Sequence, residues 1–238
     1  MALYTIADLH LSLGSEKPMD VFGSRWTDHT EKIRIRWSRL VTDEDTVVIP
    51  GDSSWASSLE EAEKDLGFID SLPGKKIIGK GNHDFWWSSM KKMNNFVSEK
   101  GFDTISFLYN NAYKVEDHVI CGSRGWYVEP SLQTEKEPDY SKIVARERQR
   151  LLTSLRRADA LDSGGLCERI LFLHFPPLFG HFRCDPLLDL IRSSGIKRCY
   201  FGHIHGDYSL PPSFEHEGTE YILISSDYLD FVPQRIFG

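Results

Sequence analysis

Long apolar runs are missing from this chain of 238 residues, and none of its hydrophobic stretches approaches the roughly 18 residues that a membrane-spanning helix needs. Cysteine is scarce, with four residues and no Cys-x-x-Cys spacing, so we expect reduced thiols rather than a disulfide framework. Repeats, low-complexity tracts and flexible linkers are absent, and the length suits one domain over residues 1–238. These absences predict a soluble single-domain protein.

Excess positive charge is also lacking, because acidic residues outnumber basic ones and give a formal net charge of −7 at pH 7. Nucleic-acid-binding domains usually carry a basic patch on a basic domain, so this balance disfavours broad affinity for a nucleic-acid backbone. An apolar run begins at Leu3 and a polar motif at Asp8, which leaves no room for a cleavable signal segment. We therefore expect a cytoplasmic protein without membrane partners.

The chain does contain five short polar segments that are rich in metal-binding side chains. They are Asp8-Leu9-His10, Gly51-Asp52, Gly81-Asn82-His83-Asp84, His174 and Gly202-His203-Ile204-His205. Four of them follow apolar runs, at residues 3–7, 46–50, 170–173 and 199–201, and a weaker run at 75–79 precedes the Asn82 segment. Such runs predict strands, and ligands bind beyond the carboxyl ends of strands in open α/β sheets. We therefore expect the five segments to converge on one site.

The five segments differ in how specific they are. Asp-x-His and Gly-Asp are common in strand-end turns, whereas Gly81-Asn82-His83-Asp84 packs a permissive glycine, an amide oxygen, an imidazole and a carboxylate into one turn. Side chains alternate along an extended chain, so Gly-His-x-His places His203 and His205 on one side. Five of the nine histidines fall inside the pattern, which favours two bound metal ions over a set of unrelated polar turns.

The periodicity of apolar residues predicts alternating helices and strands. Helices are predicted at residues 29–41, 59–72 and 140–161, a hairpin at 106–122, and further strands at 169–173, 197–201 and 220–225. This alternation is typical of an α/β layered fold with the helices outside.

The five ordered segments resemble the motifs of the calcineurin-like metallophosphoesterases, and the resemblance covers nearly the whole chain. It implies two packed mixed β-sheets flanked by helices, and hydrolysis of phosphate esters. The opening Asp8-Leu9-His10-Leu11 is similar to the branch with cyclic-nucleotide phosphodiesterases, repair nucleases and lipid A precursor hydrolases. His83 stands where the lipid A hydrolases carry arginine, which argues against that assignment. Residues 17–20 and 85–87 resemble a bacterial group of predicted phosphohydrolases.

The same resemblance implies a ligand set for two divalent metal ions. One ion would take Asp8, His10, Asp52 and His205, and the other would take Asp52, Asn82, His174 and His203, with Asp52 as the bridge. Mixed carboxylate, imidazole and amide ligands favour transition metals over all-oxygen calcium or magnesium sites. We expect manganese first, with iron or zinc as alternatives.

Other residues are candidates for catalysis and substrate binding. His83 resembles the family's general acid, and Asn82 and His83 would also contact the substrate. Asp84 would either orient the His83 ring or cap a helix. Arg124 follows a strand, and its planar guanidinium suits a phosphate oxygen. Residues 17–26 either wall the substrate pocket or form a plain surface loop.

The function that these residues favour is hydrolysis of a small phosphomonoester or phosphodiester, such as a nucleotide. A nuclease is the alternative, because the helix predicted at 140–161 carries five arginines, at positions 146, 148, 150, 156 and 157. The same arginines would also fit a solvent-exposed basic face of that helix. A non-catalytic scaffold is a third reading, and it is disfavoured because none of the expected ligands is missing. Trp86 and Trp87 either stack on a base or belong to the core, and the core is favoured.

Overall fold

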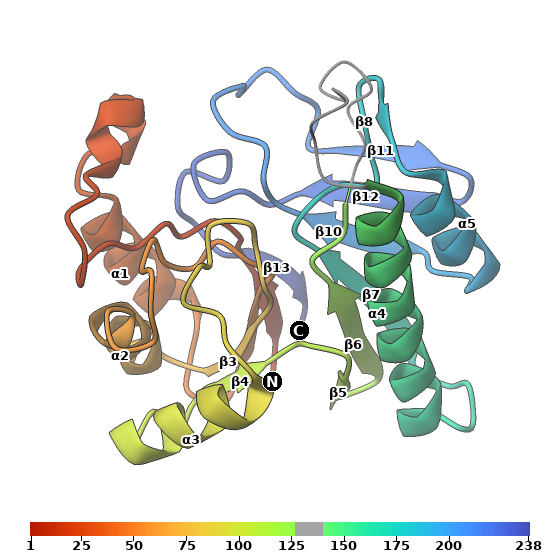
Figure 1. Cartoon of the computed structure of the whole chain (residues 1–238), viewed down its shortest axis with the longest axis horizontal. Helices are drawn as coiled ribbons and strands as arrows, with labels where there is room; N and C mark the ends of the chain where they lie inside the picture. The colour runs from red at the N-terminus through yellow and green to blue at the C-terminus, as the bar shows by residue number, and fades with distance from the viewer. Residues whose placement is uncertain (127–139) are drawn as a thin grey trace.

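A computed structural model describes residues 1–126 and 140–238 of the chain. Two β-sheets face each other at its centre (Figure 1). The first has the order β13 (Gln234–Phe237), β1 (Leu3–Thr5), β2 (Thr46–Ile49), β3 (Lys75–Ile78) and β4 (Ile105–Phe107). Its strands are parallel except for β13, so the carboxyl ends of β1, β2 and β3 point to the same edge.

The second sheet has six strands. Their order is β11 (Ser213–His216), β12 (Thr219–Leu223), β10 (Arg198–Phe201), β7 (Glu168–Leu173), β6 (His118–Ser123) and β5 (Ala112–Val115). The four central strands are parallel, and each edge strand is antiparallel to its neighbour. A small hairpin of β8 (Leu178–Phe179) and β9 (Phe182–Arg183) follows β7.

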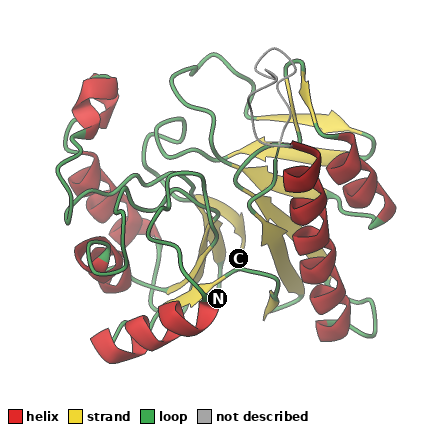
Figure 2. Ribbon diagram, in the orientation of Figure 1, coloured by secondary structure: helices red, strands yellow, loops and turns green. Residues whose placement is uncertain are grey.

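Helices cover the outer faces of both sheets, as Figure 2 shows. Among the described residues, the helices on the first sheet are α1 (His29–Leu40), α2 (Glu63–Ser71) and α3 (Met90–Lys100), with the short 3₁₀ helices η1 (Met19–Phe22) and η2 (Ser24–Trp26). The helices on the second sheet are α4 (Tyr140–Leu161) and α5 (Asp185–Ser193). The predicted fold class, two mixed sheets flanked by helices, is confirmed.

Alternating side chains along the strands build the three-layered core. In β2, Val48 packs between the sheets with Phe172 and Tyr200, whereas Val47 and Ile49 pack outward against the helices. A strand that is buried on both faces reads as a continuous apolar run. This is why the ligand-bearing strands were visible in the sequence, whereas the second sheet was implied only by the family resemblance.

Two of the predicted elements need correction. The helix predicted at 59–72 begins only at Glu63, because residues 59–62 form turns. The hairpin predicted at 106–122 is confirmed only from Ala112, where Glu116 and Asp117 join β5 to β6. The apolar residues before it belong to β4, which pairs with β3 in the other sheet. None of the helices in the described ranges is long and apolar enough to cross a bilayer.

Candidate metal centre

The two sheets are joined at their carboxyl edge, next to the motif residue Asp8. Ala7 forms a bridge to Ser225, and its N–H donates to the carbonyl of Ile224 at 2.8 Å. The N–H of Asp8 donates in turn to the carbonyl of Gly51 at 3.0 Å. The loops that follow β1, β2 and β12 are therefore tied together, which brings residues distant in sequence to one place.

The motif side chains converge at this edge, as the sequence predicted. The His174 Nε2 lies 2.6 Å from the Asn82 Oδ1 and 3.4 Å from the Asp52 Oδ2, and its Nδ1 lies 3.5 Å from the Asp8 Oδ1. On the other side, the His10 Nε2 lies 3.3 Å from the His205 Nε2 and 3.8 Å from the Asp52 Oδ2. Two groups, Asp8 with His10 and His205, and Asp8 with Asp52 and His174, each place their ligand atoms within 4.8 Å of one another.

His203 joins the cluster in a different way. Its backbone N–H donates to the Asp8 Oδ2 at 2.9 Å, and its ring centroid lies 5.2 Å from that of His174. The structure therefore places the imidazole beside the cluster but does not bring a ring nitrogen into either three-residue group.

Glycines in the motifs permit this close approach of loops. A Cβ on Gly81 would lie 2.0 Å from the Asp52 Oδ1, and a Cβ on Gly202 would lie 2.4 Å from the Asp8 Oδ2. Asp8, Asp52 and His203 themselves have positive φ values of 59°, 50° and 70°. Non-glycine residues rarely adopt this left-handed region, and such strain is concentrated at functional sites.

The electrostatics of the cluster fit a bound cation. Burial lowers the pKa of His174 to about 3 and that of His203 to about 4, which favours the neutral imidazole that can coordinate a metal. Burial and the neighbouring carboxylates of Asp84 and Asp8 raise the pKa of Asp52 well above its usual value. The cluster of carboxylates and neutral histidines therefore lacks a balancing positive charge, and a cation bound among these side chains would supply it.

Unsatisfied polar atoms point in the same direction. The Asp8 Oδ1 and the His174 Nδ1 are buried, and neither has a hydrogen-bond partner in the described part of the chain. Buried polar atoms are almost always paired. The two atoms lie 3.5 Å apart, and cations bound in this cluster would give such atoms partners, so the residues present fit the metals that the motifs imply.

A family model described as calcineurin-like phosphoesterase matches residues 1–207, which include every motif residue. The chain belongs to this family. Its members are typically hydrolytic phosphoesterases that bind divalent metals, in agreement with the ligand groups described above. None of the curated proteins matches the chain.

Two solved structures with TM-scores above 0.5 show the same fold at low sequence identity. A phosphopantetheinyl hydrolase from Mycobacterium tuberculosis is 13% identical with a TM-score of 0.52, over 99% of this chain and 95% of that one. The protein TT1561 of Thermus thermophilus is 10% identical with a TM-score of 0.53, over 95% and 89% of the two chains. AQ665 of Aquifex aeolicus, a protein of unknown function, also matches and is 17% identical with a TM-score of 0.45, over 98% and 95%.

Asp84 does neither of the two things that were expected of it. No helix begins beside it in the described ranges, since α3 starts at Met90 with Ser89 as its cap. Its carboxylate does not meet the His83 ring, whose Nδ1 has no hydrogen-bond partner among the described residues. The buried carboxylate instead accepts hydrogen bonds from the N–H groups of Asp52, Ser53, Ser54 and Gly81, the Ser53 hydroxyl and the Trp86 indole. Asp84 therefore holds the Asp52 loop and the Asn82 loop together through these hydrogen bonds.

Asp227 belongs to the site and was missed in the sequence. Its buried carboxylate lies 2.7 Å from the His205 Nδ1 and also accepts from the Tyr208 hydroxyl and the Gly206 N–H. This contact turns the His205 Nε2 towards Asp8 and His10. Asp227 follows β12 as the other ligands follow their strands, so the same strand-end argument would have found it.

We expect Asp227→Asn to weaken metal binding by roughly 10- to 100-fold, the usual effect of losing a carboxylate that orients a histidine ligand. The cause is loss of the charge that fixes the His205 tautomer and raises its basicity. Titration of the metal-free variant with manganese measures this. Asp207→Asn, a change at an exposed residue in the loop that carries His205, should leave the affinity unaltered. Equal affinities for Asp227→Asn and the unmodified protein would contradict the assignment.

An aromatic cavity of about 440 Å³ opens beside His10, His83 and His205. Its walls include Met19, Phe22, Trp26 and Trp55. The Trp55 ring stacks on His10 at 5.0 Å between centroids and lies 4.1 Å from the His83 ring. The loop at residues 17–26 therefore walls a pocket, and the plain surface-loop reading of it is wrong.

Arg124 and the paired tryptophans occupy different places. The Arg124 carbonyl accepts the N–H of His174 at 3.1 Å, while its guanidinium points into a separate cavity. Trp86 is buried and Trp87 packs against the same core, so the core interpretation of these two residues is confirmed.

Proposed function

We propose that the protein hydrolyses a small phosphomonoester or phosphodiester with the help of two divalent metal ions. The observation that carries this proposal is the convergence of the motif side chains into two three-residue ligand groups beside an aromatic cavity. One ion is assigned to Asp8, His10, Asp52 and His205, and the other to Asp52, Asn82, His174 and His203. The Asp52 Oδ2 lies within 3.8 Å of His10 and 3.4 Å of His174, a position that supports it as the bridge.

The bound metals supply Lewis-acid polarisation of the phosphoryl group and lower the pKa of the attacking water. The protein's residues set the charge of the site. Asp8 and Asp52 contribute the only formal negative charges among the proposed ligands, so two divalent ions leave a net positive site that attracts a phosphate dianion. Manganese is the proposed ion, with iron or zinc as alternatives, because the donors mix carboxylate, imidazole and amide groups.

His83 is the proposed general acid. Its backbone N–H donates to the Asp52 Oδ1 at 2.7 Å, which holds the residue next to the cluster, and its ring faces the aromatic cavity. Burial lowers the pKa of the His83 ring, whereas the negative charge of a bound phosphate raises it. The substrate would therefore help to keep the ring protonated until the proton passes to the leaving oxygen.

A substrate panel with manganese tests the proposal. It comprises p-nitrophenyl phosphate, its bis ester, cyclic nucleotides and single-stranded DNA. We expect turnover of at least one small ester, and loss of that turnover when a chelator removes the metal. Absence of metal-dependent turnover on every member of the panel would contradict the proposal.

The shape of the cavity also predicts a preference for substrates with a flat ring. Phe22 is 66% exposed and lines the cavity, whereas its neighbour Val21 is exposed and does not. Stacking of a base on an aromatic side chain is worth about 1–3 kcal/mol, so Phe22→Ala should reduce kcat/KM for adenosine 5′-phosphate by about tenfold and leave ribose 5-phosphate unaffected. Val21→Ala is the matched control. An equal loss on both esters would show that Phe22 does not contact the base.

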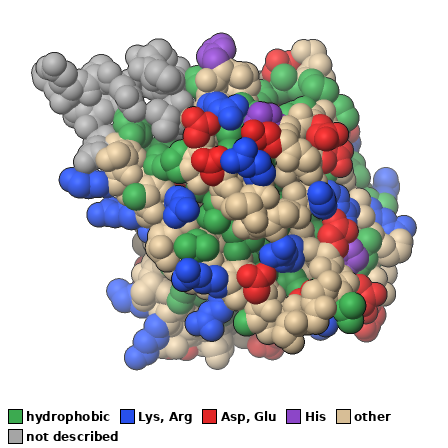
Figure 3. Space-filling model, turned by 90° about the vertical axis from the view of Figure 1, so that its right-hand side faces the viewer, with side chains coloured by type: hydrophobic (Ala, Val, Ile, Leu, Met, Phe, Trp, Pro, Cys, Tyr) green, Lys and Arg blue, Asp and Glu red, His purple; other side chains and the backbone are tan. Residues whose placement is uncertain are grey.

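A nuclease remains the second candidate, because of the arginines on α4. Figure 3 views the side of the molecule on which α4 and α5 lie and shows basic side chains gathered towards its left-hand part, with acidic ones mainly over the rest. Binding of single-stranded DNA measured across salt concentrations separates the two functions. Backbone binding weakens steeply as salt rises, in proportion to the phosphates contacted.

A further inference from the structure

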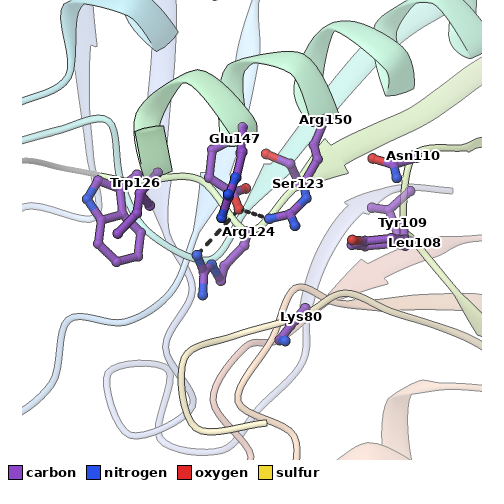
Figure 4. Close-up of a pocket in the computed structure, with 11 residues that line it drawn as sticks. Lys80, Leu108, Tyr109, Asn110, Ser123, Arg124, Trp126, Glu147 and Arg150 are labelled. Carbon is purple, nitrogen blue, oxygen red and sulfur yellow. Dashed lines mark hydrogen bonds and ion pairs between the residues drawn. The ribbon is translucent and has the colours of Figure 1, made fainter. Parts of the chain in front are cut away.

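A second cavity, of about 290 Å³, lies between α4 and the loops after β3, β4 and β6 (Figure 4). Four cationic side chains line it, from Lys80, Arg124, Arg146 and Arg150, together with the single carboxylate of Glu147. The other lining residues are Leu108, Tyr109, Asn110, Ser123, Trp126 and Ile143. Its lining therefore has a strong excess of positive charge, although the protein as a whole is acidic.

The sequence of α4 explains how this charge is gathered. Ile143, Arg146, Glu147 and Arg150 are spaced by three and four residues, so they share one face of the helix. Arg148, Arg156 and Arg157 are exposed and do not line the cavity. The arginines of α4 thus fall into two sets, one exposed to solvent and the other, Arg146 and Arg150, lining the cavity.

Glu147 positions the guanidinium groups. It is completely buried, and its Oε1 accepts hydrogen bonds from Arg150 and, at 3.4 Å, from Arg124. Figure 4 shows the two arginines meeting at this carboxylate. A buried carboxylate is costly unless it is paired, and this one holds two planar cations from different elements side by side. Such forks suit the oxygens of a phosphate group.

The cavity also adjoins the metal centre. Lys80 precedes Asn82 by two residues, which keeps their Cα atoms within about 7 Å. The Arg124 carbonyl accepts the His174 N–H at 3.1 Å, and its guanidinium lies 5.9 Å from the Phe175 ring, which packs 4.3 Å from His203. The cavity and the metal centre are therefore neighbours, linked by the Asn82 loop and by the contacts of Arg124 with His174 and Phe175.

We propose that this cavity binds a second phosphate group of the substrate, so that the ester cleaved at the metal centre carries another phosphate at some distance from the first. This inference rests on the proposed function. A cavity of about 290 Å³ accommodates one terminal anionic group, whereas a nucleic-acid strand needs a groove that follows its backbone. The substrate class is thus a small bisphosphorylated molecule.

Direct binding tests the cavity apart from catalysis. Inorganic phosphate is titrated calorimetrically into the full-length protein in the presence of a chelator, so that the metal centre does not contribute. We expect saturable binding that weakens by about tenfold or more in Arg150→Gln and in Arg146→Gln, because a hydrogen bond to a charged group is lost. Arg148→Gln, on the same helix but outside the cavity, is the matched control. Absence of saturable binding, or equal weakening in all three variants, overturns the proposal.

Kinetics then connect the cavity to the substrate. With manganese, the unmodified protein should cleave adenosine 3′,5′-bisphosphate with a lower KM than adenosine 5′-phosphate, and Arg150→Gln should remove this advantage by raising KM for the bisphosphate alone. Equal kinetics of Arg150→Gln and the unmodified protein on both esters would overturn the inference while the proposed function stands. Phosphate binding without metal-dependent turnover of these esters or of any member of the substrate panel would contradict the proposed function and leave the phosphate-binding role of the cavity in place. Strong competition by a single-stranded DNA without terminal phosphates would overturn the small-molecule assignment.

Discussion

Asp52→Asn is expected to abolish double metal occupancy and to reduce turnover by about a thousandfold or more, since the metals supply several kcal/mol of transition-state stabilisation and each 1.36 kcal/mol is tenfold in rate. The reason is that the Asp52 carboxylate is the proposed bridge between both ions. Its Oδ2 lies 3.8 Å from the His10 Nε2 and 3.4 Å from the His174 Nε2. Metal analysis of the purified variant, together with its turnover, measures the effect.

The same variant should be more stable than the unmodified protein once metal is removed. Burial and the charges of Asp84 and Asp8 raise the pKa of Asp52, so its ionised form is destabilising at every pH above the unfolded-state value near 3.8. A neutral amide removes that penalty and keeps the shape. We expect a higher melting temperature for Asp52→Asn in chelator at pH 7, and a rise on adding manganese only for the unmodified protein. Full metal loading would contradict the bridging assignment, and a lower melting temperature in chelator would contradict the charge penalty ascribed to Asp52.

Carboxylates outside the cluster provide the control for this result. Asp20, Asp28 and Asp103 are exposed loop or surface residues. Their replacement with alanine should change turnover by less than about tenfold, as is usual for surface substitutions. A loss of metal in any one of them would show that a ligand has been misplaced.

The ligands that could be predicted from the sequence are those that directly follow a recognisable strand. Asp8, Asp52, His174 and His203 each lie just beyond a strand whose apolar residues are continuous, so both the strand and the edge at which the ligands meet could be predicted. The long helix at 140–161 was predicted with its observed bounds, because its apolar stripe continues without interruption and Gly164 and Gly165 follow it.

The parts that were missed depend on contacts between distant segments. Asp84 was read against its neighbour His83, yet its partners lie some thirty residues away in the Asp52 loop. Glu147 was not singled out among the charges of its helix, and only the packing of α4 against the loop of Arg124 shows that it is buried. Periodicity reports which face of an element is buried but not which distant element meets that face.

His83→Ala is expected to leave both metals bound and to reduce turnover by roughly 10²–10⁴, the range typical of a positioned general acid. The ring lies at the cavity beside Trp55 and His10, and His83 belongs to neither ligand group. The loss should depend on the leaving group. A nitrophenolate departs without a proton, so p-nitrophenyl phosphate should be affected least, whereas an alkyl phosphate needs protonation of its leaving oxygen and should be affected most.

This contrast separates proton donation from electrostatic attraction of the phosphate, because an attraction would be lost equally for every substrate. Turnover of the two ester types by His83→Ala, with metal content measured on the same samples, provides the test. His181→Ala, at an exposed histidine outside the cavity, should behave as the unmodified protein. Equal losses on both esters would reassign His83 to binding the phosphate, and release of a metal ion would make it a ligand.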